Sequence, residues 1–193
     1  MSAKLDVGFV IDCEATCWNT REEQGSKPNE IIEIGLAKLN YETGEVTKFP
    51  SYVVRPRFTQ VSDFCTELTG WTQEAIMEQG KDIARVLRDI KAEHDIKPEH
   101  VWYSCGNYDK NMLSSRTPKG VGKLYGIKPE NNPFDIMSTH VNVKTLFALK
   151  HKLKKEVGMD RMLQLMGETL EGRHHVGADD AYNIAKIAKH VIS

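Results

Sequence analysis

VIDCEATCW, residues 10–18, ends an apolar run with two carboxylates, Asp12 and Glu14, that are separated by one residue. We predict a strand over residues 5–14. Side chains alternate across a strand, so Asp12 and Glu14 project from one face while Cys13 points away. Two like charges this close repel each other, and both lose hydration at a strand end. A divalent cation would relieve both costs; the alternative is a strand that simply emerges into solvent.

The segment after this strand carries a hairpin pattern. Residues 18–29 are polar and contain Gly and Pro, which indicates a loop. Residues 30–40 and 46–56 are rich in β-branched and apolar side chains and flank the turn sequence YETGE, residues 41–45. Two such runs around a Gly-containing turn are typical of a β-hairpin. This part of the chain therefore predicts three antiparallel strands.

The rest of the chain mostly follows the period of helices. Residues 82–95 are the clearest case, because their apolar side chains recur on one helical face. Further helices are predicted at 62–68 and 72–80, each begun by a Ser or Thr cap, and at 109–116, 144–155, 158–166 and 178–192, with a strand at 101–105 and irregular structure at 117–133. This order predicts an α/β domain with a mixed sheet.

The composition is that of an ordinary soluble globular protein. The 193 residues predict a single domain over 1–193, with 40% apolar and 27% charged residues. The formal net charge of −1 gives no overall basic character that would demand nucleic acid. Residues 116–155, however, hold nine Lys and Arg against two acids. That excess fits either a basic approach surface beside an acidic site or a solvated, lysine-rich helix face.

The four cysteines do not form a zinc-type pattern. Cys13 and Cys17 are four residues apart, and Cys65 and Cys105 do not supply the second pair of a tetrahedral site. We interpret all four as reduced thiols of a cytoplasmic protein. The N-terminal apolar run is too short for a signal peptide, and no segment has the roughly 18 apolar residues that a membrane span requires.

A third acid, Asp180, stands at the head of the apolar stripe of the C-terminal helix. Ile184, Ile187 and Val191 form that stripe, and Asp180 lies one turn before Ile184. A carboxylate in this position is costly unless it is paired, capped or bound to metal. Asp179 lies about 100° round the helix and is expected to face outward, where it favours the helix N-terminus. The alternative is that Asp180 also only complements the helix dipole.

A fourth acid, Asp109, repeats this arrangement. It follows the strand at 101–105 and stands three and four residues before Met112 and Leu113. It therefore also heads an apolar helical stripe at the end of a strand. The alternative is that Asn107 caps this helix and leaves Asp109 as an ordinary acid of the first turn.

Three separate segments thus bring acids to element ends that should face the core. In open α/β sheets, such ends gather at one crevice. Four carboxylates meeting there need positive charge, and their hard oxygen ligands favour Mg²⁺ or Mn²⁺ over zinc. Two such ions about 3.5–4 Å apart are used for phosphodiester cleavage. The pattern predicts a two-metal site formed by Asp12, Glu14, Asp109 and Asp180.

His175 is the candidate proton acceptor for an attacking water. It lies five residues before Asp180, and Gly172 and Gly177 bracket it, which allows a mobile loop. A histidine near its ordinary pKa of about 6.5 suits general-base catalysis at neutral pH. His174 competes for this role, and a structural histidine remains the alternative.

The order Asp-x-Glu, Asp, His-x₄-Asp resembles the DEDD exonucleases of the histidine subtype, the DEDDh family. The resemblance covers about residues 7 to 190 and is similar to the branch that holds the histone-mRNA and small-RNA 3′ exonucleases and their bacterial relatives. It implies a ribonuclease H-like fold with a central mixed sheet of five strands, three of them antiparallel at the N-terminus, flanked by helices. The segments that carry it are IDCEATCW, NEIIEIG, YVVRP, QVSDFCTELTGWTQ and GRHHVGADDAYNIAKIA.

The resemblance also implies roles for the five residues. Asp12, Glu14 and Asp180 would hold the metal between the nucleophile and the scissile phosphate. Asp12, with Asp109 through water, would hold the second metal at the leaving oxygen. His175 would deprotonate the attacking water. Mg²⁺ is the expected cofactor, as two ions, and Mn²⁺ is expected to substitute for it.

Contacts to the substrate are implied in the same way. Glu14 and the backbone of Ala15 and Thr16 would contact a terminal 3′-OH. Leu68 and Trp71 would line the terminal base. His175 would also contact the substrate. Trp71 stands where this branch commonly has a smaller aliphatic residue, so its ring is expected to stack on the base. Trp18 could stack on a base in the same way. The alternative for either ring is a place in the hydrophobic core.

The predicted function is a metal-dependent 3′–5′ exonuclease that releases nucleoside 5′-monophosphates from a single strand with a free 3′ end. RNA is favoured and DNA is the alternative substrate; an accessory RNA-binding domain is not seen, which favours short single strands. A haloacid-dehalogenase-type phosphatase also begins with a strand ending in acids, but it needs Asp-x-Asp where this chain has Asp12 and Glu14. A non-catalytic nucleic-acid-binding or regulatory module is the third hypothesis.

Overall fold

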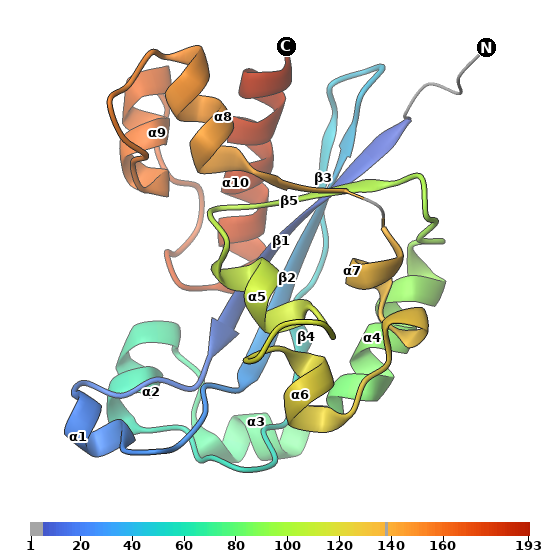
Figure 1. Cartoon of the computed structure of the whole chain (residues 1–193). Coiled ribbons are helices and arrows are strands. Elements are labelled where there is room, and N and C mark those ends of the chain that lie inside the picture. The colour runs from blue at the N-terminus through green and yellow to red at the C-terminus, as the bar shows by residue number, and fades with distance from the viewer. Residues whose placement is uncertain (1–5, 138) are drawn as a thin grey trace.

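A six-stranded mixed sheet is the centre of the computed structural model, which describes residues 6–137 and 139–193 (Figure 1). The strands run in the order β3-β2-β1-β5-β6, and β4 pairs with β2 beside β3. β1 pairs antiparallel with β2 and parallel with β5, so the predicted mixed sheet is confirmed. The strands are β1 (Val7–Ala15), β2 (Ile31–Asn40), β3 (Val46–Lys48), β4 (Tyr52–Val53), β5 (Val101–Ser104) and β6 (Thr139–Asn142).

The sheet has six strands where the resemblance implied five, and only four had been placed in the sequence, at 5–14, 30–40, 46–56 and 101–105. The second hairpin run, predicted as one strand over 46–56, divides into β3 and β4 around Pro50, which has no N–H to donate to a ladder. β6 is short and largely polar, THVN, so it lacks the alternation that marks a strand and was not predicted. Leu5, which the first predicted strand includes, lies outside the described residues.

The helices agree with the sequence where apolar periodicity or a cap marks them. Ser62 and Thr72 accept from the amides of Cys65 and Ala75 and begin their helices as predicted. In the described residues, no helix has the length and apolar character of a membrane span. The helices are α1 (Arg21–Gln24), α2 (Asp63–Thr69), α3 (Gln73–Gln79), α4 (Ile83–Glu93), α5 (Tyr108–Leu113), α6 (Val121–Tyr125), the 3₁₀ turn η1 (Pro129–Asn131), α7 (Pro133–Ile136), α8 (Val143–Lys150), α9 (Met159–Met166) and α10 (Gly177–Ile192).

Two predicted irregular segments contain short helices. The loop at 18–29 contains α1, which Thr20 caps by accepting from the amide of Glu23. The segment at 117–133 contains α6 and η1. Two of its three glycines stand at the ends of α6, Gly120 as the N-cap and Gly126 as the left-handed C-cap, while Gly122 lies inside the helix. Residues that usually break helices therefore bound this one, which is why composition alone was misleading.

The alternation along β1 divides its side chains between two cores. Phe9, Ile11 and Cys13 pack with α4, α5, α6 and α7 on one face of the sheet. Val10 packs on the other face with α8, α9 and α10, and these two helical layers are visible on either side of the sheet in Figure 1. Asp12 and Glu14 share the parity of Val10, so the predicted alternation directs both carboxylates toward α10.

The N-terminus of α10 lies directly on β2 at a glycine. Gly35 is paired with Asp12 across the β1–β2 ladder. A Cβ built on Gly35 would lie 1.8 Å from the carbonyl oxygen of Gly177, the first residue of α10. The missing side chain is what allows the helix backbone to approach the strand. This contact sets the distance between Asp12 on β1 and Asp180 in the first turn of α10.

Replacing Gly35 by Ala is expected to destabilise the protein by about 3 kcal/mol. The new methyl group would collide with the backbone of Gly177, which cannot rotate away as a side chain can. Gly158→Ala is the matched control, because a Cβ at Gly158 meets nothing within 4 Å; its unfolding free energy should change by less than about 1 kcal/mol. Chemical denaturation measures both, and equal losses would contradict this account of the β2–α10 contact.

Candidate metal centre

Three carboxylates from β1 and α10 meet at one point. Asp12, Glu14 and Asp180 each offer an oxygen, and these oxygens lie within 4.8 Å of one another. β1 supplies two of the acids from the face that its alternation directs toward α10, and the first turn of α10 supplies the third. The acids line a cavity of about 310 Å³ that Asp109 and His175 also line. All five residues predicted for the centre therefore lie at one cavity.

Asp109 reaches this cavity through an edge of β1 that β5 leaves open. β5 pairs with β1 only as far as Val10, which faces Tyr103. The amide of Cys13 lies beyond that point, and it donates to Asp109 Oδ1 over 3.0 Å. Asn107 stands at the N-cap position of α5 but makes no side-chain cap hydrogen bond. Asp109 is thus held against the backbone beside Asp12, although it is not among the three acids within 4.8 Å.

His175 lines the cavity with a partly exposed side chain and has a left-handed backbone conformation. Its φ is +64°, and its amide donates to Asp180 Oδ2 over 2.9 Å. Its Nδ1 lies 3.7 Å from Glu14 Oε1. The neighbouring His174 lies 3.7 Å from Asp180 Oδ2 and 3.6 Å from Asp160 Oδ1. Both histidines therefore border the acids, but His175 is the one that also approaches Glu14.

Burial and mutual repulsion raise the pKa values of the acids. Burial is the largest cause for Asp12, whose pKa lies well above its ordinary value, and the charges of Asp109 and Asp180 raise it further. Burial, followed by the charges of Glu33 and Asp180, raises the pKa of Glu14 to about 8. Burial also raises the pKa values of Asp109 and Asp180 to about 6. Without a counter-ion, the cluster binds protons near neutral pH.

One oxygen of this cluster has no protein partner. In the described part of the chain, Asp180 Oδ1 is buried and accepts no hydrogen bond, while Oδ2 of the same carboxylate accepts from the amide of His175. A buried, unsatisfied carboxylate oxygen is costly. It lies in a group of three acids whose oxygens are close enough to share a ligand. The donor set, all hard oxygen atoms, fits a divalent cation such as Mg²⁺ or Mn²⁺.

Replacing Asp180 by Asn is expected to stabilise the metal-free protein at about pH 8. Burial raises the pKa of Asp180 from 3.8 to about 6. A carboxyl with a raised folded-state pKa contributes stability that is complete below its unfolded pKa and is lost as the pH rises through the folded value. At about pH 8 the substitution removes a buried charge, and the Asn side chain has nearly the same shape as the Asp side chain. Thermal unfolding in chelator should show a midpoint about 2–4 °C higher, and no gain at about pH 4.

Asp179→Asn is the matched control for this prediction. Burial acts to raise the pKa of Asp179, but the amide of Arg173 and the ammonium of Lys48 outweigh it, and the pKa is lowered. Its contribution to stability is therefore present above the unfolded pKa and lost in acid, the opposite sign to that of Asp180. Asp179→Asn should lower the midpoint at about pH 8. Two variants that shift the midpoint in the same direction would contradict the assignment.

Of the residues predicted to contact substrate, Glu14 and His175 line the cavity, whereas Ala15, Thr16, Leu68 and Trp71 do not. Thr16 is fully buried; its amide donates to the carbonyl of Glu30, and its own carbonyl accepts from Asn29. Ala15 ends β1 next to it. Leu68 lies near the end of α2, where its carbonyl accepts from the Arg173 guanidinium. These contacts tie the predicted substrate segments to the strand and loop that carry the acids.

Glu33 is a buried acid that the sequence analysis missed. It faces Glu14 in the β1–β2 ladder. One oxygen accepts from Trp71 Nε1 over 2.7 Å, and the other accepts from the amide of Gly177 over 3.1 Å. Glu33 thereby joins the segment predicted to meet the terminal base to the N-terminus of α10. The sequence contained a sign of this role: Glu33 lies inside the apolar run IIEIG, and a glutamate there is costly to bury without partners.

Known proteins with sequences similar to this chain are exonucleases. The RNase_T model, described as "Exonuclease", matches residues 9–188. The human 3′-5′ exoribonuclease 1 is 30% identical over 189 residues, which is 93% of this chain and 50% of that protein. The ERI1 exoribonuclease 2 of Xenopus laevis is 29% identical over 209 residues, which is 95% of this chain and 28% of that protein. The chain therefore spans half or less of the length of these curated relatives.

Solved structures show the same similarity. The nuclease domain of 3′hExo, a DEDDh family member bound to rAMP, matches with a TM-score of 0.79 and 29% identity over 97% of this chain and 92% of that chain. A 3′-exonuclease that recognises the 3′ end of the histone mRNA stem-loop matches with a TM-score of 0.79 and 26% identity over 99% of this chain and 83% of that chain. Both comparisons extend over nearly the whole chain.

Proposed function

Because the chain belongs to the RNase_T exonuclease family, of the DEDDh type with a ribonuclease H-like fold, we propose that it is a metal-dependent 3′–5′ exonuclease. Its substrate is a single strand with a free 3′ end, RNA in preference to DNA, and its products are nucleoside 5′-monophosphates. The observation that carries the proposal is the meeting of Asp12, Glu14 and Asp180 within 4.8 Å in one cavity. Residues 1–193 act as one exonuclease domain.

The acids hold two divalent cations in this proposal. Asp12, Glu14 and Asp180 bind one, and Asp12, with Asp109 through water, binds the other; the ions are Mg²⁺, for which Mn²⁺ substitutes. When bound, such ions stabilise the attacking and leaving oxygens of a phosphodiester. The support from this chain is Asp180 Oδ1, which has no hydrogen-bond partner among the described residues, and the raised pKa values of the acids, which bound cations would lower again.

His175 accepts the proton of the attacking water. Burial is the largest cause that lowers its pKa, and the adjacent charge of His174 lowers it further. The imidazole is therefore neutral at physiological pH and free to take a proton. Its ring lines the cavity beside Glu14, and it is more exposed to solvent than the Glu14 carboxylate.

The free 3′ end is recognised beside Glu14 and the backbone of Ala15. Thr16 holds this strand end in place from the buried side, through its hydrogen bonds to Glu30 and Asn29. Leu68 and Trp71 lie on the flank of the terminal base. The preference for RNA follows the relatives whose names state exoribonuclease activity. We also propose a cytoplasmic location, which the four free cysteines support.

A panel of 5′-labelled strands tests this function. RNA and DNA, single- and double-stranded, with a free or a 3′-phosphorylated end, are incubated in Mg²⁺, Mn²⁺ or excess chelator. We expect a ladder of shortened products from the single strand with a free 3′-OH, faster for RNA, and none in chelator. Release of phosphate from a monoester without a ladder would favour the phosphatase. Metal-independent binding without turnover would favour the binding module.

A further inference from the structure

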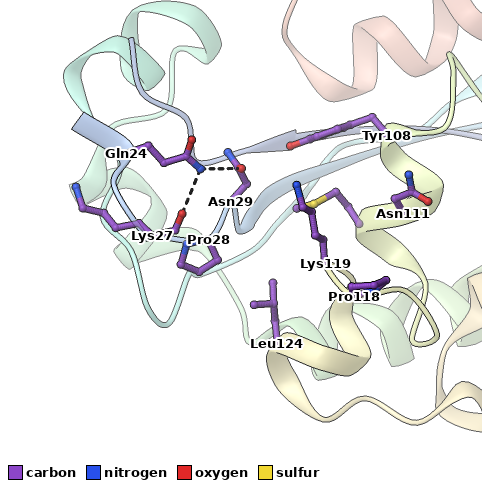
Figure 2. Close-up of a pocket in the computed structure, with 10 residues that line it drawn as sticks. Gln24, Lys27, Pro28, Asn29, Tyr108, Asn111, Pro118, Lys119 and Leu124 are labelled. Atoms are coloured by element: carbon purple, nitrogen blue, oxygen red, sulfur yellow. Dashed lines mark hydrogen bonds between the residues drawn. The ribbon is translucent and has the colours of Figure 1, made fainter. Parts of the chain in front are cut away.

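A second cavity opens beside the metal centre, between the α1–β2 loop and helices α5 and α6. Its volume is about 360 Å³, and we call it the α5–α6 cavity. Figure 2 shows Tyr108, Asn111 and Lys119 on the side of α5 and α6, and Gln24, Lys27 and Asn29 on the opposite side. It is large enough for a nucleobase with its sugar, since ligand pockets of about 300 Å³ and more hold small organic groups.

Tyr108 joins this cavity to the metal centre. Its side chain lines both the α5–α6 cavity and the cavity of the four acids. Tyr108 precedes Asp109 in the chain and is 51% exposed, although it is a large aromatic residue. An exposed ring between two adjacent cavities offers a surface on which a base can stack. Tyr108 therefore stands where the two cavities adjoin.

The lining of the α5–α6 cavity suits a phosphate-bearing ligand. Lys27 and Lys119 stand on its two sides. Over residues 6–137 and 139–193, the Lys119 ammonium has neither an ion pair nor a hydrogen bond. Lys27 donates to the carbonyl of Glu23, and its ammonium lies 5.2 Å from the centre of the Trp18 ring. Among the described residues that line the cavity, there is no Asp or Glu to repel an anion. Apolar contacts from Leu124 and amide groups such as that of Asn111 complete a mixed surface.

Hydrogen bonds connect the wall of this cavity to the strand that carries the acids. The Asn29 amide donates to the carbonyl of Thr16 over 2.6 Å, two residues after Glu14. The Gln24 amide donates to Asn29 Oδ1 and to the carbonyl of Lys27. The α1–β2 loop is therefore held to the end of β1. A ligand group in the α5–α6 cavity has a defined position relative to the metal centre.

We propose that the α5–α6 cavity binds a nucleotide of the substrate strand upstream of the scissile phosphate, with its base beside Tyr108 and its phosphate near Lys119. The inference rests on the proposed exonuclease function. In the proposed function the terminal nucleotide lies toward Leu68 and Trp71, which do not line the α5–α6 cavity, and Tyr108, which lines both cavities, connects the metal centre to the position of the upstream nucleotide. The cavity thereby favours substrates with several nucleotides before the cleaved bond over the shortest ones.

Two substrates distinguish an effect on the metal centre from an effect on the α5–α6 cavity. The p-nitrophenyl ester of uridine 5′-monophosphate carries the terminal nucleotide and a leaving group but no upstream strand. A labelled hexanucleotide RNA carries both. Lys119→Glu reverses the charge at the cavity, and Lys123→Glu is the matched control, because Lys123 is exposed on α6 one turn further along and does not line the cavity. Both variants change the net charge by the same amount.

We expect Lys119→Glu to raise the KM of the hexanucleotide by roughly five- to tenfold relative to Lys123→Glu, the size expected for one phosphate contact. Hydrolysis of the ester should be equal in the wild type and both variants. The salt dependence of hexanucleotide KM should also be shallower for Lys119→Glu, because fewer counterions are released. Equal KM values for the two variants, or an equal loss on the ester, would overturn the cavity assignment while leaving the exonuclease in place. A wild type that cleaves neither substrate would instead overturn the proposed function.

Discussion

Replacing Asp12 by Asn is expected to lower kcat/KM on a 5′-labelled single strand by about 10³-fold or more. Asp12 lies between the other acids: its carboxylate is within 4.8 Å of Glu14 and Asp180, and Asp109 is the largest source of charge that raises its pKa. In the proposed centre it binds both cations. Losing a ligand shared by two ions removes several kcal/mol of transition-state stabilisation, and each 1.36 kcal/mol is a factor of ten.

The Asn variant should keep its fold, because the amide has nearly the same shape and removes a charge that burial disfavours. Circular dichroism and unfolding in chelator check this, and calorimetric titration with Mn²⁺ checks the loss of metal binding. Asp89→Asn is a matched control, since Asp89 lies on α4 in the opposite helical layer and pairs with Lys81. Wild-type activity in Asp12→Asn, or undiminished wild-type activity in excess chelator, would refute the two-metal proposal.

Replacing His175 by Asn is expected to lower kcat by about 10²–10³-fold with little change in KM, the size usual for loss of a general base. Asn is the right replacement, because His175 has φ +64° and Asn tolerates the left-handed region that Ala does not. Its amide can still donate to Asp180 Oδ2. The pH profile gives a second readout. Burial lowers the pKa of His175 below its ordinary 6.5, so wild-type kcat should fall only in the acid range below that value.

His174→Asn is the control for this second prediction. His174 is the neighbouring residue, borders Asp180 and Asp160, and does not approach Glu14 among the ion pairs of the described residues. Its replacement should lower kcat less than tenfold and leave the acid limb of the profile in place, an estimate that assumes only an indirect effect on the acids. If His174→Asn were the more damaged variant, the general base would have to be reassigned to His174.

Much of the fold follows from local patterns that the sequence displays. The caps at Ser62 and Thr72 begin helices as predicted, because a side-chain oxygen satisfies an orphan amide there. The apolar face of α4 is buried, as its period requires. β6 and α6 were missed, because a four-residue polar strand and a five-residue helix between glycines carry too little periodic signal. Tertiary contacts stabilise these two elements: β6 pairs with β5, and Val121 of α6 packs in the hydrophobic core.

In the candidate site too, some features follow from local sequence patterns and others only from the tertiary structure. The alternation along β1 determined that Asp12 and Glu14 share a face, and the stripe of α10 determined that Asp180 faces inward. The sequence alone, through the order of these acids, Asp109 and His175, also indicated the exonuclease family. These features depend on the strand and helix repeats, which are local properties of the backbone.

Only the tertiary structure decided which groups are within reach of one another. The missing Cβ of Gly35 lets α10 approach β2 and brings Asp180 to Asp12. The same packing buries Thr16, gives Glu33 its two partners, and leaves Asp180 Oδ1 with none in the described chain. Distances between remote segments depend on how whole layers pack, and no short stretch of sequence records that.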